Sequence, residues 1–198
     1  MQTLILARHG ESEYSARGLL NGDASVEVGL TELGEEQARA LGRAPGMAHL
    51  DLCVTTELGR TRRTAELALA GRDIPIEIWA ELNDPRAGSF EGRHIDDYRG
   101  WAWTAGSSER APGGGESRQE VVARCAAAYR ALLERPEHTI LVVLHALPIA
   151  YLLDALEGGA PAARMDRPVE YARPYPVEAA ALSHAVTVLE AWCADPGW

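Results

Sequence analysis

The alternation of short aliphatic runs with segments of helical periodicity is the feature that most constrains the fold of this chain. Thr3–Ala7 and Thr139–Leu144 are continuous apolar runs of the kind found in strands buried on both faces. Leu52–Thr56 and Ile74–Trp79 are two further predicted strands, the second with an apolar period of two. Strands that alternate with helices favour an α/β fold, because parallel strands need long connections such as helices.

Capping residues and apolar stripes place the helices between these strands. Thr31 is a candidate N-cap followed by acidic residues, and Ser117 with Glu120 predicts a capping box. The expected helices run from Thr31 to the stop at Pro45-Gly46, over Arg60–Ala70, near Ile95–Thr104, from Ser117 onward, and from Pro148 to Leu156.

The length of 198 residues is typical of one domain, so residues 1–198 are expected to form a single one. Its least regular stretch, rich in Gly and Pro, is expected to be a substrate-loop region at about 81–116. The tail is predicted to form two strands, Val177–Leu182 and Ala185–Trp192.

The charge of the chain restricts its partners. The 19 Lys and Arg residues stand against 29 Asp and Glu residues, which gives a formal net charge of −10. Binding to nucleic acid or to an anionic membrane needs a broad basic surface, so neither partner is expected. A small anionic ligand remains compatible with this charge, because a pocket can carry a local field opposite to the global one.

The expected cellular location is the cytoplasm. The N-terminal apolar run is interrupted at Arg8, and no uncharged stretch approaches the ~20 residues of a membrane span. Cys53, Cys125 and Cys193 are widely spaced, as expected of free thiols in a reducing compartment. No zinc-ligand spacing is present, and four histidines are expected to be surface or loop residues: His49, His94, His138 and His184.

Histidine and arginine side chains gather where predicted strands end. Arg8 and His9 follow the first strand, His145 follows Thr139–Leu144, and Arg60 begins the helix after another strand. Ligands of open α/β sheets bind at the carboxyl ends of strands, and a helix N-terminus favours anions. If the strands are adjacent, these imidazole and guanidinium groups form a pocket for a dianion such as phosphate.

A set of short motifs extends in a fixed order along nearly the whole chain. They are Arg8-His9-Gly10-Glu11-Ser12, Gly22 with Leu30-Thr31, Gly34-Glu35-Glu36-Gln37-Ala38, Thr56-Glu57-Leu58-Gly59-Arg60 with Thr64-Ala65, Gly88-Ser89-Phe90-Glu91-Gly92, Pro112–Ser117, and the strand leading to His145. Together they resemble the histidine phosphatases of the phosphoglycerate-mutase-like superfamily, in the branch with the short Arg-His-Gly signature. The resemblance implies a three-layer α/β/α sandwich with a mostly parallel central sheet.

The resemblance also implies a covalent mechanism. His9 would be the nucleophile, attacking phosphorus through one unprotonated ring nitrogen to give a phosphohistidine. Arg8, Arg60 and His145 would stabilise the charge on the oxygens of the phosphoryl group. Backbone N–H groups near Gly22 and Ala146 would add donors. No metal and no cofactor is expected, because the fixed cationic side chains supply the electrostatic stabilisation.

The leaving group needs a proton donor, which the family usually supplies as a Glu placed four residues before a Gly. Here that position is Asp84, with Gly88 four residues on, and Glu81 is the alternative. Because Asp is the stronger acid, its pKa must be raised for this role at neutral pH.

Two positions depart from the family pattern. Ser15 stands where the family often has Asn, and Ala146 where it usually has Gly. Both are compatible with phosphate binding, since a hydroxyl can donate a hydrogen bond and Ala is small. The expected substrate-binding residues are Ser15, Asn21, Gly22 and Ala146.

Three functions fit these residues. The preferred one is a metal-independent phosphatase that hydrolyses a small phosphorylated metabolite. A phosphoglycerate-type mutase has the same pocket, but the segment after Asp84 lacks the Arg-His-Tyr-Gly continuation of mutases. A non-catalytic phosphate-binding protein on the same fold is the third. A homodimer is expected at the level of the family only.

Overall fold

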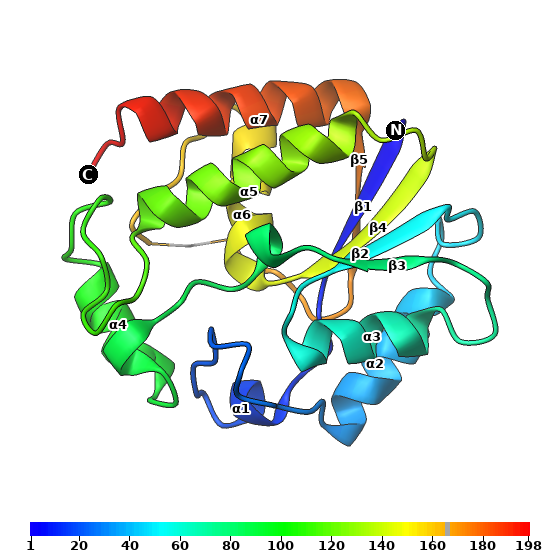
Figure 1. The fold of residues 1–198 in the computed structure, drawn as a ribbon, viewed down its shortest axis with the longest axis horizontal. Coiled ribbons are helices and arrows are strands. Elements are labelled where there is room, and N and C mark those ends of the chain that lie inside the picture. The colour runs from blue at the N-terminus through cyan, green and yellow to red at the C-terminus, as the bar shows by residue number, and fades with distance from the viewer. Residues whose placement is uncertain (165–166) are drawn as a thin grey trace.

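The computed structural model describes residues 1–164 and 167–198. Their strands form one sheet in the order β3-β2-β4-β1-β5 (Figure 1). The strand bounds are Thr3–Arg8 for β1, Leu52–Thr55 for β2, Ile76–Ile78 for β3, Thr139–Leu144 for β4 and Pro174–Glu178 for β5. β1, β2, β3 and β4 pair in parallel, and β5 is antiparallel to β1. The α/β class and the mostly parallel sheet are therefore confirmed.

Helices cover both faces of this sheet, which confirms the three-layer arrangement (Figure 1). One face packs on α5 (Arg118–Leu133), α6 (Ala146–Leu156) and α7 (Ala179–Ala194). The other face packs on α2 (Glu32–Gly42) and α3 (Gly59–Ala68).

The strands alternate between these two cores, as a period of two requires. Leu4 and Leu6 of β1 belong to the core with α5, α6 and α7, whereas Ile5 and Ala7 belong to the core with α2 and α3. Every one of these side chains is buried. A sheet buried on both faces holds its strand ends rigidly, and those ends carry the site described below.

The predicted capping residues are confirmed. The Thr31 hydroxyl accepts from Gly34 N–H at the start of α2, and Ser117 with Glu120 forms the capping box of α5. Both interactions satisfy N–H groups that have no partner inside the helix.

The prediction for the tail was wrong. Ala185–Trp192 lies inside α7 and not in a strand, and the helix also includes Leu182. Leu182, Val186 and Leu189 recur at helical spacing and are all buried against the neighbouring helices. The apolar residues of this segment follow the helical period, and the strand ends before it, at Glu178 of β5.

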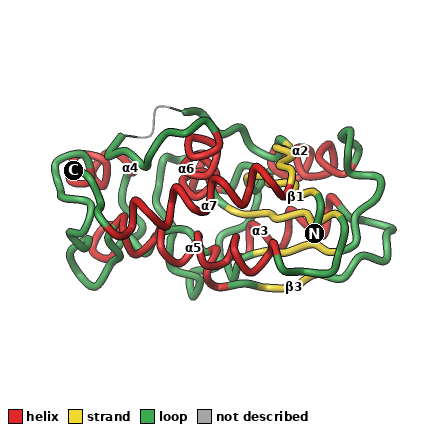
Figure 2. Tube along the Cα trace, turned by 90° about the horizontal axis from the view of Figure 1, so that it is seen from above, coloured by secondary structure: helices red, strands yellow, loops and turns green. Residues whose placement is uncertain are grey.

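The region at about 81–116 has a small core of its own. It contains two 3-10 turns, Ala80–Leu82 and Gly88–Phe90, and helix α4 (Ile95–Ala102). Phe90 and Tyr98 pack together with the partly buried Trp101. Figure 2 shows α4 at the end of the molecule far from the N-terminus, beyond the sheet.

The short helix α1 (Glu13–Ala16) completes the elements that surround the sheet, and Ser12 caps it. Among the described residues, no helix has both the length and the apolar character that crossing a membrane requires.

Candidate active site

Two histidines meet because β1 and β4 are adjacent parallel strands. Arg8 pairs with Leu144 in the register, so His9 and His145 follow at the same edge of the sheet. His9 N–H donates to the Leu144 carbonyl at 3.0 Å, and the two imidazole centroids are 5.4 Å apart. The convergence expected from the strand ends is therefore present.

Arg60 lies between them at the start of α3 and is 3 % exposed. Its Nε–H donates to His9 Nε2 at 3.1 Å, and its Nη2 donates to His145 Nδ1 at 3.2 Å. Asn21 accepts from the same guanidinium with its side-chain oxygen at 2.5 Å and its carbonyl at 2.8 Å. Arg60 thus fixes the relative positions of both imidazoles.

The hydrogen bonds of His9 define its tautomer. Nδ1 lies 2.7 Å from the Gly10 carbonyl, an acceptor, so Nδ1 carries the proton. Nε2 then presents its lone pair to the pocket and accepts from Arg60. Burial, together with the charges of Arg60 and Arg8, holds the pKa of His9 well below its usual value. The ring is therefore a neutral imidazole with an available nucleophilic nitrogen.

A chain of hydroxyl groups orients His145. Thr61 donates to the Leu58 carbonyl at 2.8 Å, so its oxygen accepts from the Thr56 hydroxyl at 2.9 Å. Thr56 Oγ1 is then the acceptor for His145 Nε2–H at 3.1 Å. This leaves Nδ1 of His145 unprotonated and directed toward Arg60. Burial and the nearby Arg60 charge lower the pKa of His145 well below its usual value.

Asp84 completes the cluster, whereas Glu81 lies outside it. Asp84 Oδ2 is 2.9 Å from Arg60 Nη2 and 3.6 Å from His145 Nδ1. Loss of water around the carboxyl raises the pKa of Asp84 above its usual value, against the lowering effect of the Arg60 and Arg8 charges. The Glu81 side chain is exposed and lines a different cavity. The geometry thus places a carboxyl with a raised pKa at the position that spacing assigned to the acid.

Arg8 lies on the other side of His9. Its guanidinium stacks 3.7 Å from the centroid of the Tyr171 ring and donates from Nη1 to the Val169 carbonyl at 3.0 Å. Burial lowers the pKa of Arg8, but a guanidinium keeps its charge in proteins. Neither partner is a carboxylate, so this positive charge remains available to an anion.

A cavity of about 440 Å³ opens above these groups. Arg8, His9, Arg60 and Asp84 form its charged end. The rest of its wall is mostly apolar or aromatic, with Arg99 and Arg118 as two further cationic side chains, and its apolar and aromatic members include Tyr14, Leu19, Leu20, Ile95, Tyr98, Trp103 and Leu147. Trp103 is 44 % exposed there, whereas Trp101 packs into the core with Phe90. The cavity therefore suits a ligand with one anionic end and one less polar end.

The predicted substrate-binding residues Ser15, Asn21, Gly22 and Ala146 all line this cavity. Their hydrogen-bond donors differ in whether they already have a partner within the protein. Gly22 N–H donates to Glu91 Oε2 at 2.8 Å, so the expectation that it serves as a free donor was wrong. Ala146 begins α6, where the positive end of the helix dipole faces the site. Ser15 Oγ lies 2.9 Å from Ser12 Oγ, so one of these two hydroxyls donates a hydrogen bond to the other.

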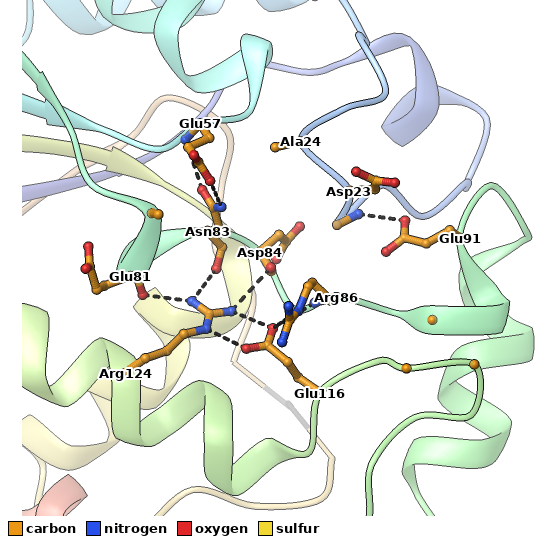
Figure 3. A pocket seen from close by; sticks show the side chains of 15 residues that line it. Asp23, Ala24, Glu57, Glu81, Asn83, Asp84, Arg86, Glu91, Glu116 and Arg124 are labelled. Atoms are coloured by element: carbon orange, nitrogen blue, oxygen red, sulfur yellow. Dashed lines mark hydrogen bonds and ion pairs between the residues drawn. The ribbon is translucent and has the colours of Figure 1, made fainter.

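A second cavity, of about 670 Å³, shares Asp84 and Gly22 with the first and lies along the segment that carries Asp84 (Figure 3). Its labelled acidic residues include Glu57, Glu81 and Glu116, and Arg124 reaches across it. The sequence assigned no role to Arg124 of this second cavity, nor to Thr56 and Tyr171, which contact His145 and Arg8 at the first.

The remaining histidines of the described residues do not form a metal site. His49, His94, His138 and His184 are all exposed. Within the described chain, no group of His, Cys, Asp and Glu side chains is arranged to hold a metal ion.

Comparison with known proteins agrees with this geometry. The profile of the histidine phosphatase superfamily (branch 1) matches residues 4–186. The chain belongs to this superfamily. It is similar to the adenosylcobalamin/alpha-ribazole phosphatase of Salmonella typhimurium, with 44% identity over 94 residues, 48% of this chain and 46% of that protein. That match therefore spans about half the length of either chain.

Two longer matches lie in the same superfamily. The probable phosphoglycerate mutase GpmB of Salmonella paratyphi B is 32% identical over 168 residues, 80% of this chain and 76% of that protein. The crystal structure of the alpha-ribazole phosphatase from Shigella flexneri superimposes with a TM-score of 0.75 at 31% identity, covering 88% of this chain and 89% of that one. These histidine phosphatases share the fold and differ in the reactions that their names describe.

Proposed function

We propose that this chain is a phosphatase that hydrolyses a small phosphomonoester through a phosphohistidine on His9. The observation that carries the proposal is the state of His9: its Nε2 is unprotonated and lies at the base of a cavity beside two guanidinium groups. A neutral imidazole nitrogen is a nucleophile, and Arg8 and Arg60 can bind the oxygens of the group that it attacks. The relatives named alpha-ribazole phosphatase support a hydrolytic reaction.

In the first step, His9 Nε2 attacks phosphorus while the bond from phosphorus to the leaving oxygen breaks. Arg60 Nε–H, which now bonds to Nε2, turns to a phosphoryl oxygen as the nitrogen becomes phosphorylated. The leaving oxygen takes a proton from Asp84, whose pKa is raised by burial, the direction that the role of an acid requires. Arg8 and Arg60 offset the charge on the phosphoryl oxygens.

In the second step, water attacks the phosphohistidine and the phosphorus–nitrogen bond breaks. The Asp84 carboxylate takes a proton from this water, which restores the acid, and inorganic phosphate leaves. His145 contributes once an anion is bound: its Nδ1 has a lone pair in the free protein, and a nearby phosphoryl dianion raises its pKa so that it becomes a donor. No step requires a metal ion.

The wall of the cavity restricts the alcohol part of the ester. Leu19, Ile95 and Trp103 line this cavity together with the guanidinium groups of Arg99 and Arg118. The alcohol part of the ester therefore meets both apolar surface and hydrogen-bond donors, which favours an alcohol that has a planar or apolar surface and a group that accepts hydrogen bonds. The net charge of −10 also opposes long polyanions.

A mutase is the second candidate, favoured by the similarity to GpmB. A mutase must hold a second anionic group and keep water from the phosphoenzyme. The cavity adjoining the site along the Asp84 segment is lined by more carboxylates than guanidinium groups, including Asp23, Glu57 and Glu116, and this field opposes a second anion there. Arg99 and Arg118 line the cavity of the phosphoryl site and are the cations that a second anionic group would meet. We favour hydrolysis because two of the relatives are named as phosphatases, and retention of the pocket without turnover is the third alternative.

The test is phosphate release from p-nitrophenyl phosphate in the presence of EDTA. Turnover should persist with the chelator and disappear in His9→Ala, and phosphate release from phenyl phosphate, whose leaving group needs a proton, should fall strongly in Asp84→Asn. Mass spectrometry after an acid-avoiding quench should detect a phosphorylated peptide that contains His9.

Each alternative has its own signature. Activity lost with EDTA would refute the metal-free mechanism, and full activity in His9→Ala would refute the nucleophile. Isomerisation of 3-phosphoglycerate faster than phosphate release would establish a mutase. Binding of phosphate without turnover of any ester in a panel of phosphorylated metabolites would establish the non-catalytic alternative.

A further inference from the structure

The backbone that carries Asp84 has few partners of its own. Residues 83–87 form no helix or strand, so their carbonyl groups need hydrogen-bond donors from other parts of the protein. Arg124, in the second turn of α5, supplies several of them. Its Nη1 donates to the carbonyls of Glu81 at 2.8 Å and Asn83 at 2.7 Å, and its Nη2 donates to the Asp84 carbonyl at 3.3 Å (Figure 3).

Glu116 orients the guanidinium that makes these bonds. Arg124 Nε donates to Glu116 Oε1 at 2.9 Å, and Nη2 donates to Oε2 at 3.0 Å, which is the two-point geometry of a strong ion pair. Their side chains are 19 % and 7 % exposed. Glu116 Oε2 also accepts from Arg86 N–H at 2.9 Å. The pair therefore holds the chain on both sides of Asp84.

Further contacts fix the remaining directions in which this segment could move. Asn83 and Glu57 exchange two hydrogen bonds, of 2.9 and 2.8 Å. Glu91 accepts from Ala87 N–H and from Gly22 N–H, both at 2.8 Å, and so connects the segment to the loop that contains Asn21 and binds Arg60. These bonds hold the backbone of the segment, while the Asp84 side chain contacts Arg60 and His145.

We propose that Arg124, held by Glu116, is a positioning residue that sets the Asp84 carboxyl at the leaving-group oxygen. This inference rests on the proposed function. Arg124 bonds to the Asp84 carbonyl and forms no hydrogen bond to its carboxyl, so its direct contact acts on the position of the acid, while its charge lowers the pKa of the carboxyl less than those of Arg60 and Arg8 do. A lysine offers one point of charge and cannot span three carbonyls and a carboxylate, so the role requires the planar fork of arginine.

The experiment compares esters that differ in how much they need an acid. p-Nitrophenolate is a good leaving group, whereas phenolate and alkoxides leave only with a proton. Purified Arg124→Lys and Glu116→Gln are expected to lose about tenfold to hundredfold in kcat on phenyl phosphate and on an alkyl phosphate, as for a reacting group displaced by about 1 Å. The loss on p-nitrophenyl phosphate should be several times smaller, and KM should change little.

Three further variants make the comparison decisive. Asp84→Asn should show the same dependence on the leaving group, and Asp84→Asn with Arg124→Lys should lose no more than Asp84→Asn alone, since both act on one proton transfer. Arg130→Lys is the matched control: Arg130 is on the same helix, 38 % exposed, and pairs with Glu190. It should keep wild-type rates on all three esters. Thermal unfolding should show that each variant is folded at the assay temperature.

The outcomes separate the inference from the function on which it rests. Equal losses on all esters in Arg124→Lys, with leaving-group dependence retained in Asp84→Asn, would overturn the positioning role and leave the acid in place. Additive losses in the double variant would also overturn it. No leaving-group dependence in Asp84→Asn would refute the acid role of Asp84, and the inference with it.

Discussion

The imidazole of His145 lies between a hydroxyl and a guanidinium, and this pair of partners decides which nitrogen carries the proton. Thr56 accepts from Nε2–H, so Nδ1 keeps the lone pair that faces Arg60. The Thr56 oxygen also accepts from Leu58 N–H at 3.3 Å, next to the start of α3. A single buried hydroxyl thus orients an imidazole and supports the helix that carries Arg60.

Thr56→Val should weaken both functions of this hydroxyl. Two buried N–H donors lose their acceptor, which costs about 1–3 kcal/mol in the free energy of unfolding. His145 is then free to adopt the other tautomer, and kcat/KM for p-nitrophenyl phosphate should fall about tenfold, which corresponds to ~1.4 kcal/mol. Urea denaturation and steady-state kinetics measure the two effects.

Two threonine variants serve as controls. Thr56→Ser keeps the hydroxyl and should retain most of the activity. Thr55→Val changes the neighbouring buried residue, whose Oγ1 makes only a 3.4 Å contact with the Glu77 carbonyl, and should leave kcat/KM unchanged. Wild-type kcat/KM in Thr56→Val would contradict the role given to the hydroxyl.

The sequence predicted the reactive residues better than it predicted the residues that orient them. Arg8, His9, Arg60, Asp84 and His145 come together as expected, because strand ends and helix starts mark them in the sequence. The residues that hold these reactive groups in place have no comparable signal in the sequence. Arg124 occupies an ordinary helical position and binds backbone carbonyls, and which carbonyls it meets depends on the path of a loop. The engagement of Gly22 N–H by Glu91 was missed for the same reason.

At the scale of elements, close backbone approach holds the loop after His9 against the first turn of α2. A Cβ on Gly34 would lie 2.0 Å from the Glu11 carbonyl oxygen, and a Cβ on Gly10 would lie 2.3 Å from that of Gly34. Real Cβ atoms do not approach an oxygen so closely, so both positions require glycine. This contact positions the segment that carries the Arg-His-Gly motif.

Gly34→Ala and Gly100→Ala should therefore change stability in opposite directions. Both glycines are inside helices, where alanine is favoured by about 1 kcal/mol. At Gly34 the overlap with backbone outweighs this gain, and a net loss of about 1–3 kcal/mol is expected. At Gly100 nothing lies within 4 Å of the added carbon, so the variant should gain up to about 1 kcal/mol. Urea denaturation measures both, and a stabilised Gly34→Ala would contradict the packing argument.

The elements themselves differ in how well the sequence predicts them. α2 and α5 begin at residues whose side chains bond to the helix N-terminus, and such local chemistry is visible in the sequence. α7 has no side-chain cap, and its apolar residues are dense enough to fit two periods. Its helical state is set by packing against α5 and α6, which the sequence does not display.

For the whole molecule, the surface charge and the site charge have opposite signs. The chain carries a net charge of −10, while Arg8 and Arg60 bring two buried positive charges to one cavity. Only Asp84 offsets them there by an ion pair among the described residues. The two imidazoles remain neutral because they are buried and because a further positive charge beside these guanidinium groups would be costly. The site is thus prepared for an anion and depends on histidines that stay unprotonated.

This arrangement should make the fold sensitive to mild acid. The pKa values of His9 and His145 are well below 6.5 in the native state, so between those values and about 6.5 the unfolded chain binds protons that the native chain does not. Stability is therefore complete above pH ~6.5 and is lost as the pH falls through this window. Each histidine contributes a slope of about 1.4 kcal/mol per pH unit.

Urea denaturation between pH 7.5 and about 5 would measure this slope, above the range in which ordinary carboxylates titrate. The two histidines together should give about 2.7 kcal/mol per pH unit at its steepest. His145→Asn should remove about half of it, because one of the two proton uptakes is gone, whereas His184→Asn, at an exposed position on α7, should leave it unchanged. An unchanged slope in His145→Asn would mean that the imidazole is not held neutral by its burial beside Arg60.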